Sequence, residues 1–131
     1  MTEKRIDIAH IYIDENGFCR IDLDTSKKDN MDEELATQLC DSIVEVCQNK
    51  PRKFLTNTVM SNGYVSPEAR AVIRHHPGMV MIRSAEAFVI NSLANRIILS
   101  MYLKIDKPSN PTKVFKDIES AKKWLSSLVV I

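Results

Sequence analysis

Few residues of this chain are of a type and spacing that could do chemistry. A zinc site would need His75 and His76 together with His10 or a cysteine, but adjacent histidines cannot present the i, i+4 face of helical zinc motifs. No serine lies in a Gly-x-Ser-x-Gly pattern, and the three glycines are too far apart to form a phosphate-binding loop. We therefore expect a non-enzymatic protein without catalytic residue, metal or cofactor, with an uncharacterised enzyme as the last of the alternatives.

The cysteines are expected to be free thiols. An odd number of them, three in 131 residues, does not make a disulfide framework. Cys40 and Cys47 are seven positions apart on an expected helix, which separates their Cα atoms by about 10 Å and exceeds the roughly 7 Å that a disulfide tolerates. We interpret them as buried thiols of a cytoplasmic protein.

Composition and hydropathy bound the class of protein. With 44% hydrophobic and 27% charged residues the chain is typical of a globular protein, and its length predicts a single domain over residues 1–131. The longest nearly apolar stretch, residues 93–103, is interrupted by polar side chains and is too short to span a membrane. The expected location is cytoplasmic, with a peripheral position at a membrane as the alternative.

Charge is unevenly distributed along the sequence. Residues 1–49 carry 12 acidic and 5 basic side chains, residues 50–131 carry 5 acidic and 13 basic ones, and the net charge is only +1. We expect the acidic and basic elements to become neighbours in one fold, because net charge bears on association more than on architecture. The alternative is a basic face for an anionic partner, and no nucleic acid is expected.

The first third of the sequence predicts a hairpin followed by a helix. Residues 8–13 and 18–23 are rich in β-branched and aromatic side chains, and Asn16-Gly17 between them favours a tight turn in which both residues have positive φ. Apolar side chains then recur at helical spacing and predict a helix over residues 31–48, in which Asn30 and Glu33 could form a capping box.

The remaining sequence alternates strands and helices. Strands are expected at residues 53–59, 85–90 and 112–115, and helices at 66–75, 93–105 and from 118 onward. Each helix follows a residue type that favours an N-cap: Ser66, Asn91 or Ser92, and Asp117. Pro77-Gly78 interrupts the pattern, and residues 79–82 are expected to be loop or extended. The order ββαβαβαβα predicts an α/β fold with a mixed five-stranded sheet and four helices.

The C-terminal third contains motifs that resemble a known family. The motifs are Asn91-Ser92-Leu93-Ala94-Asn95-Arg96-Ile97-Ile98, Lys107-Pro108, Pro111-Thr112-Lys113-Val114-Phe115-Lys116-Asp117 and Ala121-Lys122-Lys123-Trp124-Leu125. They are similar to the SpoIIAA-like, or STAS/SEC14-like, branch of the STAS domains: a helix, a Lys-Pro break, a strand ending in Phe and a helix ending in Trp-Leu. The order of elements resembles that family over the whole chain, and the motifs cover roughly residues 85–128.

The resemblance implies a non-enzymatic regulatory module that binds a protein partner. The best understood STAS domains are anti-sigma-factor antagonists controlled by phosphorylation of a serine at the start of the second helix, in an Asp-Ser-Ser-Gly context. The matching loop here reads Met60-Ser61-Asn62-Gly63-Tyr64-Val65-Ser66-Pro67 and lacks that motif. Ser61 and Ser66, the latter also an N-cap, are the candidate phosphorylation sites, since a helix N-terminus favours added negative charge.

The helix expected over residues 93–105 has too little polar surface to be buried on one side only, and a helix that is apolar all round must be covered. We expect one of two arrangements. Either the helix packs between the sheet and a neighbouring helix, or part of it is an exposed surface for a protein partner, a second subunit, a lipid-like ligand or a membrane. The candidate surface residues are Arg96, Ile98, Met101, Tyr102 and Ile105. The leading hypothesis is a partner-binding module, and the alternative is a carrier or sensor of a small apolar or lipid-like ligand.

Overall fold

The structure, a computed structural model, describes residues 2–25, 30–60 and 64–129. Over these residues the chain forms five helices and two sheets. The strands are β1 (Glu3–Ile6), β2 (Ala9–Ile13), β3 (Cys19–Asp24), β4 (Asn30–Met31), β5 (Arg52–Met60), β6 (Tyr64–Val65), β7 (Arg83–Val89) and β8 (Thr112–Phe115). The helices are α1 (Glu33–Cys47), α2 (Pro67–His75), α3 (Pro77–Ile82), α4 (Leu93–Ile105) and α5 (Ile118–Ser127).

The larger sheet is mixed and has the strand order β1-β2-β3-β5-β7-β8. Its first three strands pair antiparallel, and β3, β5, β7 and β8 pair parallel. Helices connect the parallel strands: α1 lies between β3 and β5, α2 and α3 lie between β5 and β7, and α4 lies between β7 and β8. The α/β class with a mixed sheet is confirmed. The predicted counts are wrong, because the described chain has six strands in this sheet and five helices, where we expected five and four.

β1 and α3 account for the difference in counts. β1 is an edge strand in which three of four residues are charged, so it suits a solvent-exposed edge but lacks the apolar alternation that reveals a strand. α3 includes residues 79–82 and begins at Pro77-Gly78, where we expected an interruption. Pro77 fits the first turn of a helix, and His76 Nδ1 accepts a hydrogen bond from the Met79 N–H at 3.3 Å.

The predicted start of the first helix is displaced. α1 begins at Glu33, and its N-cap is Asp32, whose Oδ1 accepts a hydrogen bond from the Leu35 N–H at 2.9 Å. The capping box that we expected from Asn30 and Glu33 is therefore wrong. Asn30 instead belongs to β4, which pairs with β6 in the small sheet, so its backbone is already committed to a strand.

The hairpin between β2 and β3 is confirmed, but its turn differs from the prediction. Gly17 has a φ of 79°, whereas Asn16 is not in the positive-φ region, so the turn is not the primed type. The Asp14 carboxylate explains the difference. Its Oδ1 accepts hydrogen bonds from the backbone N–H groups of Asn16, at 2.9 Å, and Phe18, at 3.0 Å, and thereby fixes a longer loop.

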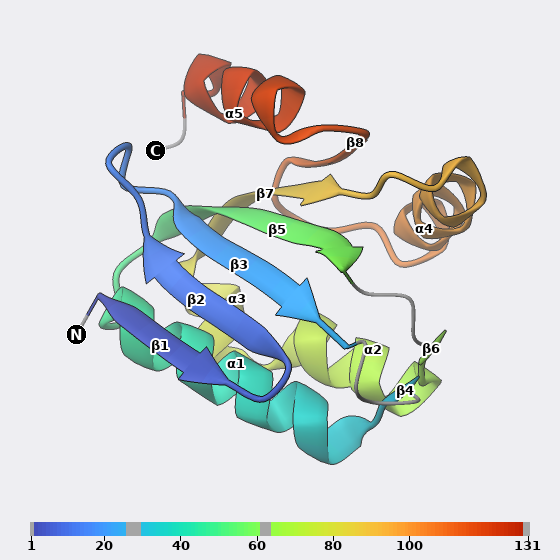
Figure 1. The fold of residues 1–131 in the computed structure, drawn as a ribbon, viewed down its shortest axis with the longest axis horizontal. Coiled ribbons are helices and arrows are strands. Elements are labelled where there is room, and N and C mark those ends of the chain that lie inside the picture. The colour runs from blue at the N-terminus through green and yellow to red at the C-terminus, as the bar shows by residue number, and fades with distance from the viewer. Residues whose placement is uncertain (1, 26–29, 61–63, 130–131) are drawn as a thin grey trace.

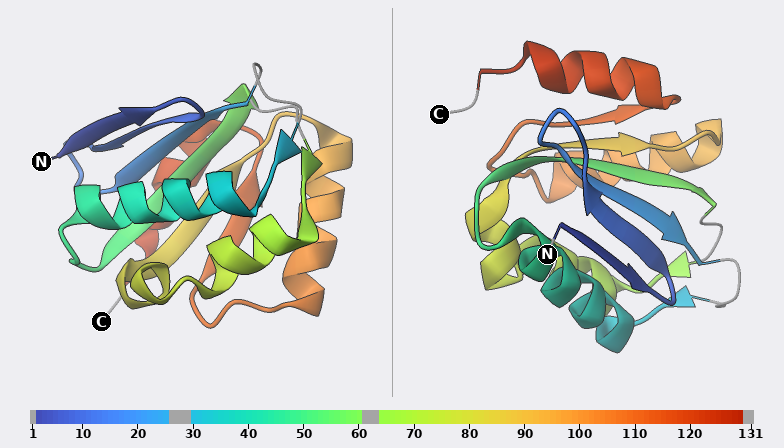
Figure 2. Two further views of the ribbon diagram at one scale, coloured as in Figure 1. Left: turned by 90° about the horizontal axis from the view of Figure 1, so that it is seen from below. Right: turned by 60° about the vertical axis from the view of Figure 1, so that its left-hand side comes forward.

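Two hydrophobic layers lie on opposite faces of the sheet. α1, α2 and α3 cover one face and α5 covers the other (Figures 1 and 2). Neighbouring residues of β5 show the alternation, since Phe54 enters the α1 layer and Leu55 the α5 layer, and both are fully buried. α5 contributes Ala121 and Leu125 to its layer. These two layers form the core and leave α4 outside it.

Candidate functional site on helix α4

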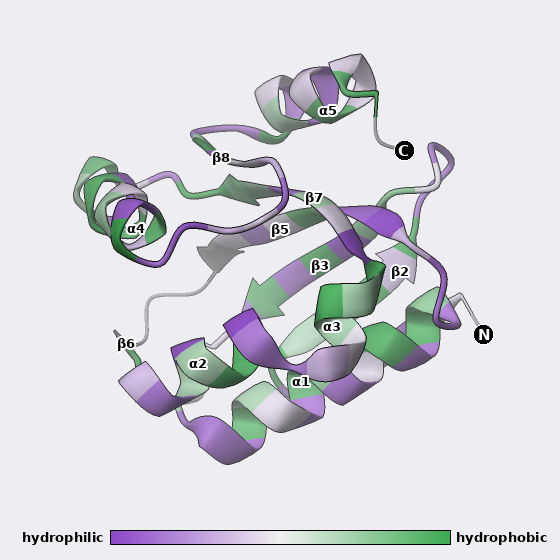
Figure 3. Cartoon of the chain, turned by 180° about the vertical axis from the view of Figure 1, so that it is seen from behind, coloured by the Kyte–Doolittle hydropathy of each residue, from purple (hydrophilic) through white to green (hydrophobic). Residues whose placement is uncertain are grey.

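α4 is a helix of 13 residues of which none is fully buried. It stands at one end of the molecule, apart from the layer of α1 and α3, and carries hydrophobic residues along its length (Figure 3). Its exposed large apolar side chains, with their exposed fractions, are Leu93 (64%), Ile97 (52%), Ile98 (51%), Met101 (57%), Tyr102 (41%) and Ile105 (81%). Such a concentration of exposed apolar surface on one element of a folded protein indicates a contact site.

The exposed apolar side chains share one side of α4, which we call the outer face. At about 100° per residue, they fall in two adjacent i, i+4 rows. The first row is Leu93, Ile97, Met101 and Ile105, and the second is Ala94, Ile98 and Tyr102. The opposite, partly buried side holds Arg96, Leu99, Ser100 and Leu103. A surface helix normally turns its more apolar side inward, and α4 does the reverse.

Arg96 does not belong to the outer face. Its Nη1 donates a hydrogen bond of 2.7 Å to the backbone carbonyl oxygen of Ile90, just beyond the end of β7. Arg96 therefore anchors the first turn of α4 to the sheet. The other residues that we predicted for this surface lie together on the outer face: Ile98, Met101, Tyr102 and Ile105.

Arg70 of α2 contacts α4 from the side. Its guanidinium carbon lies 4.2 Å from the centroid of the Tyr102 ring, and its Nη1 donates a hydrogen bond of 2.7 Å to the Val65 carbonyl oxygen. This cation–π contact ties the tyrosine to α2. Sequence reasoning missed Arg70, since no local pattern indicates a contact between residues 32 positions apart.

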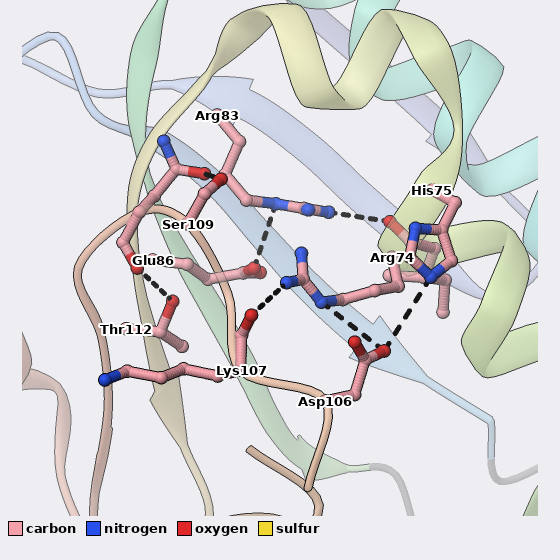
Figure 4. A network of polar contacts seen from close by, with 10 residues as sticks. Arg74, His75, Arg83, Glu86, Asp106, Lys107, Ser109 and Thr112 are labelled. Carbon is pink, nitrogen blue, oxygen red and sulfur yellow. Dashed lines mark hydrogen bonds and ion pairs between the residues drawn. The ribbon is translucent and has the colours of Figure 1, made fainter. Parts of the chain in front are cut away.

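A second attachment fixes the chain that follows α4 (Figure 4). Arg74 of α2 donates a hydrogen bond of 2.8 Å to the Lys107 carbonyl oxygen, and its Nε lies 3.6 Å from Asp106 Oδ2. His75 Nε2 lies 3.8 Å from the same carboxylate oxygen. α4 is thus held at its first turn, at Tyr102 and just after its last turn, while the outer face stays exposed.

A buried ion pair lies beneath this attachment. Arg83 Nε is 3.2 Å from Glu86 Oε1, and the two residues are only 5% and 6% exposed. Thr56 donates a hydrogen bond of 2.9 Å to Glu86, and Arg83 donates one of 2.8 Å to the Ile73 carbonyl oxygen at the end of α2. Burial raises the pKa of Glu86, and Arg83, Thr56 and Arg74 oppose that rise. Through its hydrogen bond to Ile73, Arg83 connects this buried pair to the end of α2.

The candidate phosphorylation sites differ in what the structure describes. Ser66 is the N-cap of α2, and its Oγ accepts a hydrogen bond of 3.0 Å from the Ala69 N–H. Ser61 lies outside the described residues. The N-cap interpretation of Ser66 is therefore confirmed, and its hydroxyl lies at the positive end of a helix, where a phosphoryl group would be favoured.

The cysteines are free and buried, as predicted: Cys19, Cys40 and Cys47. Burial raises the pKa of Cys40 to about 12. A hydrogen bond with the Cys47 thiol, together with burial, raises the pKa of Cys19. Cys19 and Cys40 therefore stay protonated near neutral pH and make poor nucleophiles. The same hydrogen bond with Cys19 lowers the pKa of Cys47. Among the described residues, no three His, Cys, Asp or Glu side chains are grouped so that they could hold a metal ion.

Two open hollows in the described surface lie away from α4. One, of 660 Å³, is lined by Lys4 and by polar residues of α1, and the other, of 460 Å³, by polar residues of α5. Ile98 and Tyr102 line neither of them. Ile98 and Tyr102 are 51% and 41% exposed, so an apolar ligand bound at these two side chains would rest on an outer surface.

Comparison with known proteins places the chain in a family. The family model described as a domain of unknown function, DUF7793, matches residues 18–129. The chain belongs to this family. The matched segment runs from just before β3 past the end of α5, so it includes α4 and the buried ion pair but not β1 or β2. No curated protein and no solved structure matches the chain. Across the described residues, no helix has the length and apolar character needed to cross a membrane.

Proposed function

We propose that the chain is a non-enzymatic binding module of the STAS type that engages a protein partner through the outer face of α4. The proposal rests on the orientation of α4 about its axis, because the more apolar side of this helix faces away from the rest of the protein. Covering one large apolar side chain contributes about 1.5–3 kcal/mol. A partner that covered a few of the six would therefore gain several times the thermal energy from this one helix.

The order of the main elements supports the STAS part of the proposal. With β1, the small β4–β6 sheet and the short α3 set aside, the chain reads ββαβαβαβα from β2 to α5. The free, buried thiols fit the reducing cytoplasm in which we place the module. A phosphoryl group on Ser66 would lie one turn before Arg70, which contacts Tyr102 of α4, so this serine is the switch that we propose for the surface.

A carrier of an apolar ligand is the less favoured function. A carrier would enclose its ligand in a cavity beside Ile98 and Tyr102, since small-molecule sites bury most of the surface of what they bind. These two side chains are 51% and 41% exposed on the outer face. A flat apolar surface of this kind suits a macromolecular partner better.

Photo-cross-linking in cells that natively express the chain tests the proposal. Benzoylphenylalanine in place of Met101 should form adducts with a protein. The matched control carries the same probe in place of Met81 of α3, which is 77% exposed but lies on another helix. Protein adducts at 101 above the level at 81 support the proposed function, whereas equal yields, or adducts with lipids alone, contradict it.

A further inference from the structure

We propose that the partner on the outer face of α4 is a second copy of this chain, packed helix against helix about a two-fold axis. This inference rests on the proposed function, because it names the partner of the same surface. Three features of α4 support it: the exposed apolar area, the rows of side chains on the outer face and the position of the charges.

The exposed area suits a small homodimer. A large side chain has roughly 150–250 Å² of surface, so six that are about half exposed present on the order of 600 Å². Two copies would together bury about 1,200 Å², which is the lower end for specific, stable interfaces. The same area reaches the upper end of what the largest apolar patch of a monomer exposes, about 300–600 Å². We therefore expect a real but modest affinity, with a Kd on the order of 1 µM.

The two rows of side chains on the outer face make it self-complementary. Rows at i, i+4 spacing form ridges with a groove between them, and two helices with such ridges pack at a crossing angle of about −50°. On α4 the ridge through Ile97 and Met101 lies beside the ridge through Ala94, Ile98 and Tyr102, where the small Ala94 leaves room in the groove. In a two-fold pair, the first ridge of each copy can enter the groove of the other.

The charges of α4 favour an antiparallel pair. The helix contains no acidic residue, and Lys104 is the cation on its outer side. In a parallel pair the two Lys104 side chains would lie next to each other. In an antiparallel pair centred on the middle of the helix they lie about 15 Å apart along the axis, at 1.5 Å per residue. That separation exceeds the Debye length of about 8 Å at physiological salt, so their repulsion is screened.

A membrane fits this helix less well than a second copy does. Helices that lie in a membrane interface expose a polar face rich in lysine and arginine beside the apolar one. The corresponding side of α4 instead packs on its own protein through Leu99 and Leu103, and the guanidinium of Arg96 is engaged with the Ile90 carbonyl oxygen. The polar side that would stay in water above a bilayer is thus used for packing.

Sedimentation of the purified chain tests the inference. From about 0.01 µM, well below the expected Kd, to about 100 µM, well above it, the wild type should shift from a monomer of 14.9 kDa to a species of twice that mass. Met101→Glu and Ile97→Glu should remain monomeric with unchanged circular dichroism, whereas the matched control Met81→Glu should dimerise like the wild type. A wild type that stays monomeric over this range overturns the inference, as does a Met101→Glu variant that dimerises normally.

Cross-linking with a short bismaleimide tests the antiparallel arrangement, and the buried native thiols should not interfere. Ile98→Cys, near the two-fold axis, should cross-link on its own. Leu93→Cys and Ile105→Cys should each fail alone but cross-link when the two variants are mixed. Efficient linkage of either end variant to itself contradicts the antiparallel pair.

The failure of this inference can be told from the failure of the proposed function. If the wild type is monomeric but the probe at 101 captures a different protein, the homodimer is refuted and the proposal of a protein-binding surface is retained. If the wild type is monomeric and instead binds vesicles of anionic phospholipid in a manner that Met101→Glu abolishes, both proposals are overturned in favour of a membrane.

Discussion

Arg83→Met should destabilise the fold by about 3–5 kcal/mol, because it leaves a buried carboxylate without its cation. Glu86 is 6% exposed; in the wild type its Oε1 lies 3.2 Å from Arg83 Nε, and its Oε2 accepts a hydrogen bond of 2.9 Å from the Thr56 hydroxyl. The substitution also removes the hydrogen bond of 2.8 Å from Arg83 to the Ile73 carbonyl oxygen. The loss would be a large fraction of the roughly 5–15 kcal/mol that stabilises a domain of this size.

The free energy of unfolding that Arg83→Met loses should increase as pH rises. Burial already raises the pKa of Glu86 above its ordinary 4.5, and removal of the Arg83 charge, which lowers it, raises it further. Between 4.5 and the folded pKa the folded state binds more protons than the unfolded state, so this group makes stability fall as pH rises through that window. Arg83→Met should therefore lose more stability than the wild type between pH 5 and pH 8.

Urea unfolding of four proteins at both pH values measures these effects. The set is the wild type, Arg83→Met, Glu86→Leu and the double variant. Since a buried ion pair replaced whole by apolar residues is often neutral, the double variant should be more stable than Arg83→Met alone. A loss below about 1 kcal/mol for Arg83→Met, or simple additivity in the double variant, would refute this account of the pair.

Three further predictions concern other parts of the fold. Gly78→Ala should cost about 1–3 kcal/mol in denaturant unfolding, because its Cβ would lie 2.8 Å from the stiff side chain of Val44; a neutral effect would show that α1 and α3 are not so closely packed. The Ser120 N–H lowers the pKa of Asp117 below 3.8, so the cap should stabilise α5 above that pH and be lost as pH falls through the lowered value; a carboxyl titration by NMR that ends at or above 3.8 would contradict this. The Cys40 thiol, with a pKa of about 12, should resist a thiol-specific reagent at pH 8 until denaturant is added, and rapid labelling of the native chain would speak against its burial.

Local signals in the sequence predicted most of the elements. The cap residues Ser66 and Asp117 marked the starts of α2 and α5, and the β-branched strand over residues 112–115 was predicted to the residue. Such features depend on neighbours a few positions away, which a single sequence displays. The sequence did not predict β1, because a charged edge strand is defined by its partner strand and has no apolar pattern of its own.

The candidate site was only partly visible in the sequence. Its composition showed that α4 is too apolar to be covered on one side alone, but only tertiary packing decides which side faces outward. Arg96 illustrates this, since its charge suggested a surface role and its position turns it toward the Ile90 carbonyl oxygen. Arg70 and Arg74 hold α4 through contacts between distant residues, and no spacing rule reaches that far.

A photo-cross-linking scan along α4 shows directly whether the outer face of this helix binds a protein. A benzoylphenylalanine probe would replace each residue from 93 to 105 in turn, and the yield of protein adduct would be measured in native cells. We expect maxima on the outer face, at Ile97, Met101 and Ile105, and minima on the packed side, at Arg96, Leu99 and Leu103. A flat profile, or maxima on the packed side, would contradict this expectation.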